Sequence, residues 1–139
     1  MSRVIQAVVI VTTLKTVISA YPFHPFYPES VVMYVAFEGL FYLVKIGIAA
    51  FIATLIPASV RWAQKLVFFG LVVSPSIFSS YFFYRNVSLY WVGGRELVRD
   101  HRITTAGFEN FLTSLGIAAF LALAAALVYF RAGPHSRSV

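Results

Sequence analysis

The chain has 139 residues, of which 60% are hydrophobic and 12% are charged. The charged share is about half that of an ordinary soluble domain, and a small fold cannot bury so much apolar surface in water. Together these values exclude a cytosolic globular domain, a disordered chain and a disulfide-rich secreted module. They predict an integral membrane protein.

The net charge of +6 comes from Lys and Arg residues scattered over the tails, the connections and two apolar segments. No basic stripe is interleaved with aromatic residues on a polar segment, so nucleic acid is not an expected partner. We interpret these cations as residues that set topology and anchor the chain at the membrane surface. The chain has no cysteine, which excludes disulfides, cysteine-ligated iron–sulfur clusters and thiolate catalysis.

Four stretches are apolar enough to cross a bilayer as helices, which takes about 20 residues each. They are residues 4–20, 31–56, 65–84 and 111–130. We therefore predict an all-α integral membrane protein, with four transmembrane helices in an up-down bundle that forms a single domain over residues 1–139. Four spans place both termini on one side, and a small excess of Lys and Arg there predicts the cytoplasmic side.

The connections between these spans differ in character. Residues 21–30 carry three prolines and four aromatic residues, which predicts a short, rigid hairpin at the membrane surface. Residues 57–64 form a tight turn, and its end carries the basic and aromatic anchors Arg61, Trp62 and Lys65. Residues 85–110 form a longer interfacial connection, in which residues 95–102 are expected to make two turns of helix. Its polar side chains form an interfacial cluster of Arg95, Glu96, Arg99, Asp100, His101 and Arg102.

Ionisable residues inside membrane spans are costly and are therefore candidates for function. The three here are Lys15, Glu38 and Lys45, and Tyr42 lies one turn from the last two. Lys15 and Glu38 lie at about 9 and 12 Å from the same end of adjacent helices, which predicts an ion pair between them. The four residues predict one polar track. Such a track suits either a proton or ion relay, or a site for a polar head such as a quinone. The alternative is an ion pair that fixes helix register, with the Lys45 ammonium reaching the interface or a partner subunit.

The fourth span carries small residues at every fourth position, which lets another helix approach closely. This helix-packing stripe consists of Ser114, Ala118, Ala122 and Ala126. The third span is bulky instead, with Phe68, Phe69 and Phe78 among its residues, and we expect it to face lipid or a partner. Its Pro75 is a candidate kink.

The sequence contains no catalytic motif, and its histidines lie outside the spans, so no catalytic, metal or cofactor-binding residue is predicted. A bound lipid or quinone is left open. The expected partners are membrane lipid and other integral membrane subunits. We therefore expect a small accessory or structural subunit of a larger membrane complex, such as an electron-transport or other energy-converting complex. The alternatives are a homo-oligomeric proton- or ion-coupled transporter that uses Glu38 and, third, a membrane-embedded lipid enzyme.

Overall fold

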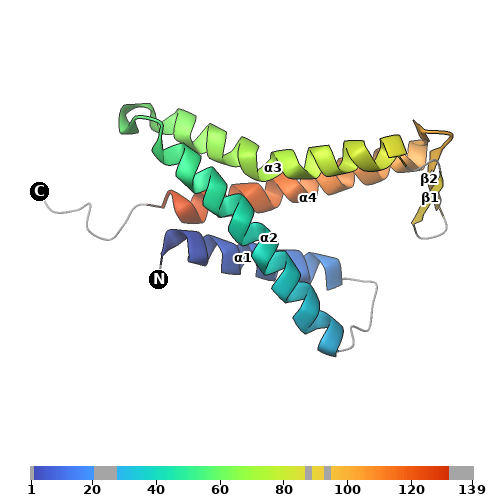
Figure 1. The fold of residues 1–139 in the computed structure, drawn as a ribbon, viewed down its shortest axis with the longest axis horizontal. Helices are drawn as coiled ribbons and strands as arrows, with labels where there is room; N and C mark the ends of the chain where they lie inside the picture. Colours follow the sequence, from blue (N-terminus) through green and yellow to red (C-terminus); the bar gives the residue numbers. More distant parts are fainter. Residues whose placement is uncertain (1, 21–27, 87–88, 93–94, 132–139) are drawn as a thin grey trace, which may run out of the picture. The chain divides into compact units, whose positions relative to one another are not determined.

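The structure is a computed structural model that describes residues 2–20, 28–86, 89–92 and 95–131. In these residues the chain is mostly helical, with four long helices and one small sheet (Figure 1). The elements are α1 (Arg3–Ala20), α2 (Pro28–Thr54), the short 3-10 helix η1 (Ala58–Val60), α3 (Arg61–Asn86), β1 (Leu89–Val92), β2 (Arg95–Arg99), β3 (Arg102–Ile103) and α4 (Thr105–Tyr129). The prediction of a mainly helical chain with four helices is confirmed.

Two of these helices are long and apolar enough to cross a membrane. They are the part of α2 from Val35 to Thr54 and all of α4, from Thr105 to Tyr129. Both coincide with predicted spans, although α4 begins six residues earlier than expected. The spans predicted for α1 and α3 stay predictions.

The chain divides into two compact units, which are described separately below. The first comprises Met1–Val72 and Leu121–Val139, and the second comprises Val73–Phe120. The single membrane domain expected from the sequence stays a prediction. The predicted proline-rich hairpin falls largely on residues 21–27, which lie outside the described residues.

In the first unit, α1 packs against α2 through small and branched side chains. Ala7 and Val11 of α1 are fully buried, as are Ile46 and Ala49 of α2. Small residues at a helix interface let two backbones approach closely, because no long side chain separates them.

The first turns of α3 pack against the end of α4 through an aromatic cluster, also in the first unit. The Phe68 ring is stacked on Tyr129 with centroids 5.0 Å apart, and it meets Phe130 edge-on at 5.5 Å. Phe68 is fully buried, so the expectation that it faces lipid or a partner is wrong for this residue. The Phe68 ring packs in the core against Tyr129 and Phe130, and the residue type alone does not tell a buried phenylalanine from an exposed one. Phe78 is 73% exposed, and for this residue the expectation stays a prediction.

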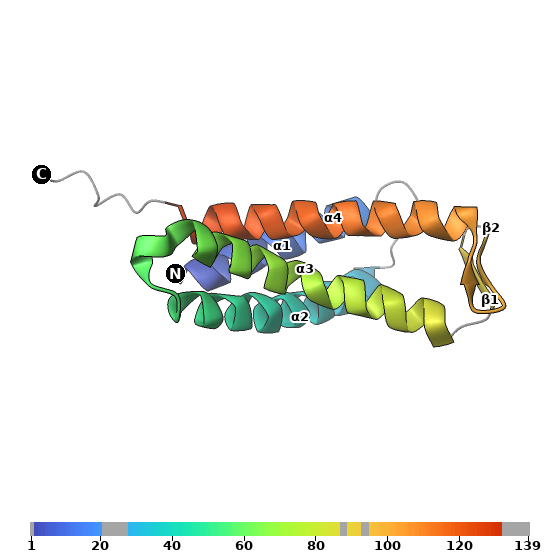
Figure 2. The same cartoon turned by 90° about the horizontal axis from the view of Figure 1, so that it is seen from above.

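In the second unit, residues 95–102 form a β-hairpin and not the expected two turns of helix. β2 pairs antiparallel with both β1 and β3 in a three-stranded sheet, and the register of the first pair shifts between Tyr90 and Trp91. Figure 2 shows β1 and β2 side by side. Asp100 and His101 link β2 to β3 with φ angles of 48° and 60°. Two successive positive φ angles are typical of the type I′ turn, which joins strands in a two-residue loop. The turn at Asp100 and His101 reverses the direction of the chain, whereas the helix expected over residues 95–102 would have continued in one direction.

Candidate functional site

Among the charged residues that the structure describes, Lys45 on α2 is the most buried, with an exposed fraction of 9%. Its Nζ lies 4.0 Å from the centre of the Phe41 ring and 5.1 Å from that of Tyr42. These partners stand four and three residues earlier on the same helix, where side chains share a face. The negative faces of the two rings stabilise the ammonium in an apolar setting.

Glu38 and Lys15 belong to the electrostatic surroundings of Lys45: the Glu38 charge attracts its ammonium and the Lys15 charge repels it. The predicted polar track stays a prediction. Among the described residues no ion pair joins Lys15 to Glu38. Among the described residues the ion pairs are Arg95–Glu109 and Arg99–Glu96.

The register of α1 on α2 is shown by Thr12 and Gly39. A Cβ added to Gly39 would lie 3.9 Å from both Oγ1 and Cγ2 of Thr12, so these two residues face each other. In antiparallel helices this register offsets Lys15 from Glu38 by about 3 Å along the axis, which is the offset expected from the sequence. The register alone therefore does not explain the missing ion pair.

Thr12 also contributes a buried hydroxyl. Thr12 is 6% exposed, and its Oγ1 has no hydrogen-bond partner among the described residues. Its carbonyl oxygen accepts a hydrogen bond from Thr16 Oγ1 at 2.8 Å. Thr12, Thr16 and Gly39 line a cavity of about 380 Å³ along α1. The cavity was not predicted from the sequence. The signals for it were the hydroxyls of Thr12 and Thr16, four residues apart, and the glycine that follows Glu38.

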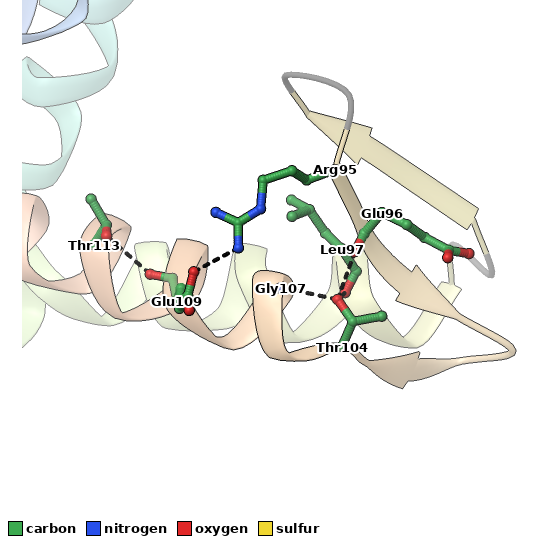
Figure 3. A network of polar contacts seen from close by, with 7 residues as sticks. All are labelled: Arg95, Glu96, Leu97, Thr104, Gly107, Glu109 and Thr113. Carbon is green, nitrogen blue, oxygen red and sulfur yellow. Dashed lines mark hydrogen bonds and ion pairs between the residues drawn. The ribbon is translucent and has the colours of Figure 1, made fainter.

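The interfacial cluster lies in the hairpin of the second unit, and its charges are partly paired there. Figure 3 shows two of its members, Arg95 and Glu96. Arg95 donates a hydrogen bond to Glu109 at 2.8 Å. Arg99 donates to Glu96 through Nε at 2.9 Å and also through Nη2. The hydrogen bond and charge of Glu96 raise the pKa of Arg99 above its ordinary value. Arg95, Glu96 and Arg99 thus stabilise local structure.

The hairpin is fastened to the start of α4 by Thr104, which the sequence analysis did not single out. Thr104 Oγ1 accepts the N–H of Gly107 at 3.0 Å and donates to the carbonyl of Glu96 at 2.6 Å (Figure 3). A threonine that accepts the third helical N–H is an N-cap, because the first N–H groups of a helix lack partners within it. The cap explains why α4 begins at Thr105, before the apolar run.

The helix-packing stripe on α4 has a mixed environment. Ala122 is fully buried, Ala118 and Ala126 are half-buried, and Ser114 is exposed. Leu121 and Ala125 are also buried. In the first unit the buried face of α4 thus extends beyond the predicted stripe. The small residues Ala49, Ala50 and Ala53 of α2 are buried as well.

The described residues contain no group of three His, Cys, Asp or Glu side chains that could hold a metal ion. Asp100, His101 and Arg102 lie exposed at the turn between β2 and β3. The polar group around Lys45 is thus the candidate site in the helices. Comparison with protein-family models, with curated proteins and with solved structures finds no match for this chain.

Proposed function

We propose that the chain is a small multi-pass accessory subunit of a larger membrane complex, with four spans and both termini in the cytoplasm. An electron-transport or other energy-converting complex is a candidate host, by analogy with the small subunits common in such assemblies. In this role the chain has no catalysis of its own. It covers apolar surfaces of larger subunits and holds lipid between them.

One observation carries this proposal: an apolar stripe that runs along α2 and stays exposed within the described residues of the first unit. Its large side chains recur at intervals of three and four residues and are between 52% and 68% exposed. They are Met33, Phe37, Leu40, Val44, Ile48 and Phe51. This spacing keeps them on one helix face, the geometry with which one helix docks on another.

The placement of the buried cation supports the same role. Lys45 lies over Phe41 and Tyr42 and is buried, so its charge interrupts the stripe little. A charge held against rings of its own helix fits a packed surface and needs no transported ion.

Extraction of native membranes in mild detergent, followed by affinity capture of the tagged chain and mass spectrometry, tests this proposal. We expect larger membrane subunits to be recovered with the chain. The double variant Phe37→Ala/Phe51→Ala should lower their recovery, because it truncates two rings of the stripe. Phe78→Ala/Phe108→Ala is the matched control, since these rings are exposed but lie on α3 and α4. A chain that is recovered alone as an active homo-oligomer would contradict the proposal.

The second candidate is a proton- or ion-coupled transporter. It is favoured by the half-buried Glu38, the buried Lys45 and the unpartnered Thr12 hydroxyl on the same helix pair. Liposomes that contain only this chain distinguish the two candidates. Proton-coupled uptake by the wild type that Glu38→Gln abolishes would favour the transporter. The accessory role predicts no uptake with the wild type or with the variant. A lipid enzyme ranks third, because no described side-chain group favours it.

A further inference from the structure

The strongest unused feature of the first unit is a groove between the start of α3 and the end of α4. It has a volume of about 440 Å³. Leu66 and Phe69 line it from α3, and Leu123 and Leu127 line it from α4. Lys65 and Arg131 complete the lining with two positive charges.

The charges and the apolar side chains are segregated along the groove. Phe68 contacts Tyr129, so the first turns of α3 lie beside the last turn of α4. From Lys65 the apolar lining extends to Phe69, about 6 Å further along α3. From Arg131 it extends back to Leu123, about 12 Å along α4. Both cations therefore lie at the same end of an apolar channel.

This end matches the level of lipid headgroups if α4 crosses the bilayer. The apolar span of α4 ends at Tyr129, two residues before Arg131. Trp62, which also lines the groove, is 70% exposed, and tryptophan favours the boundary between hydrocarbon and headgroups. Lys65 and Arg131 then stand where lipid phosphates lie.

The electrostatics at this end favour an anion. Among the described residues no acidic side chain lines the groove, and the first turn of α3 contains none. Arg3 and Arg61 line a second cavity of about 540 Å³, which shares Phe130 with the groove. Arg3 also donates a hydrogen bond to the Tyr129 carbonyl at 3.5 Å. Four cations thus surround the meeting point of α3 and α4 in this unit.

We propose that this groove is a binding site for one anionic glycerophospholipid. Its phosphate lies against Lys65 and Arg131, and an acyl chain lies along Leu66, Phe69, Leu123 and Leu127. A zwitterionic lipid fits the apolar part but carries no net charge to balance the two cations. The site goes beyond the accessory role and does not depend on it, because the chain alone supplies every lining residue.

Native mass spectrometry of the purified full-length chain in detergent tests the site, with phosphatidylglycerol or phosphatidylcholine added in equal amounts. We expect one phosphatidylglycerol to be retained per chain, in preference to phosphatidylcholine. Lys65→Gln/Arg131→Gln should weaken this retention by about tenfold, as expected for two cations near an anionic headgroup. Arg102→Gln removes an exposed cation outside the groove and should leave retention unchanged. Ala126→Phe should lower retention of both lipids, because it fills the groove and leaves the charges in place.

Circular dichroism and a monodisperse elution profile would show that each variant remains folded. The proposal is overturned if the folded Lys65→Gln/Arg131→Gln variant retains phosphatidylglycerol as well as the wild type does. It is also overturned if Arg102→Gln loses as much lipid, or if inorganic phosphate displaces the lipid. A dimer that excludes lipid, and that Ala126→Phe dissociates, would assign the groove to a second copy of the chain. None of these measurements involves a partner subunit, so their results test the lipid site independently of the proposed accessory role.

Discussion

Gly107 on α4 lies directly against the backbone carbonyl of Leu97 on β2 (Figure 3). A Cβ built on Gly107 would overlap that oxygen, and it would lie 2.8 Å from Cγ1 of Ile103. Leu97 is 2% exposed and Val98 is fully buried, so this contact closes the core between the hairpin and the helix. Only a residue without a side chain fits here.

We expect Gly107→Ala to lower the free energy of unfolding of the second unit by about 2 kcal/mol. Overpacking usually costs about 1–3 kcal/mol, and contact with rigid backbone places this substitution at the upper end of that range. The higher helix propensity of alanine offsets about 1 kcal/mol of this cost. Chemical unfolding in detergent micelles measures the change. Gly116→Ala is the matched control on the same helix, since a Cβ there meets nothing within 4 Å. Equal stability of the two variants would contradict the close contact.

We expect Thr104→Val to destabilise the start of α4 by about 1–2 kcal/mol, because it removes an N-cap and leaves the Glu96 carbonyl without this donor. Thr104→Ser keeps the hydroxyl and should restore most of the loss. Hydrogen exchange at the Gly107 amide reports the change directly, because this N–H donates to Thr104. Thr113→Val should have a smaller effect, since the Thr113 hydroxyl donates to the Glu109 carbonyl within the helix. An exchange rate unchanged in Thr104→Val would show that the cap contributes little.

Thr104 and Gly107 also explain how far the fold could be predicted from the sequence. Apolar length identifies α2 and α4, because backbone groups in lipid must be satisfied within the helix. It does not give the helix ends, which depend on caps such as Thr104. In residues 95–102, charges spaced three and four apart fit a helix as well as a strand. The hairpin is decided by the positive φ angles of Asp100 and His101 and by the fit of Gly107 on Leu97.

The residues of the candidate site around Lys45 could be predicted from the sequence, but most of the contacts between them could not. The spacing of Lys45 from Tyr42 indicates a shared helix face, and the structure places both rings beside Nζ. The facing contact of Thr12 and Gly39 joins segments distant in sequence, so residue spacing alone does not predict it.

We expect Phe68→Ala to destabilise the first unit by about 3–5 kcal/mol, the usual loss for a fully buried phenylalanine. The variant also removes the stacked contact with Tyr129 and the edge contact with Phe130. Thermal unfolding followed by circular dichroism in detergent measures the loss. Phe78→Ala is the matched control, because Phe78 is 73% exposed on the same helix and should change stability by about 0.5 kcal/mol or less. Similar losses in the two variants would show that Phe68 is not a core residue.

We expect Lys45 and Phe41 to be energetically coupled by about 1 kcal/mol, because the ammonium lies 4.0 Å from the ring centre in an apolar environment. A double-mutant cycle of Lys45→Met and Phe41→Leu measures this coupling from four unfolding free energies. Lys45→Met alone should leave stability equal or higher, since an apolar side chain of similar length replaces a buried charge. Phe41→Leu should therefore destabilise the wild type more than it destabilises Lys45→Met. Strictly additive effects would mean that the ring does not hold the ammonium. Lys45 would then be available to Glu38, as the transporter alternative requires.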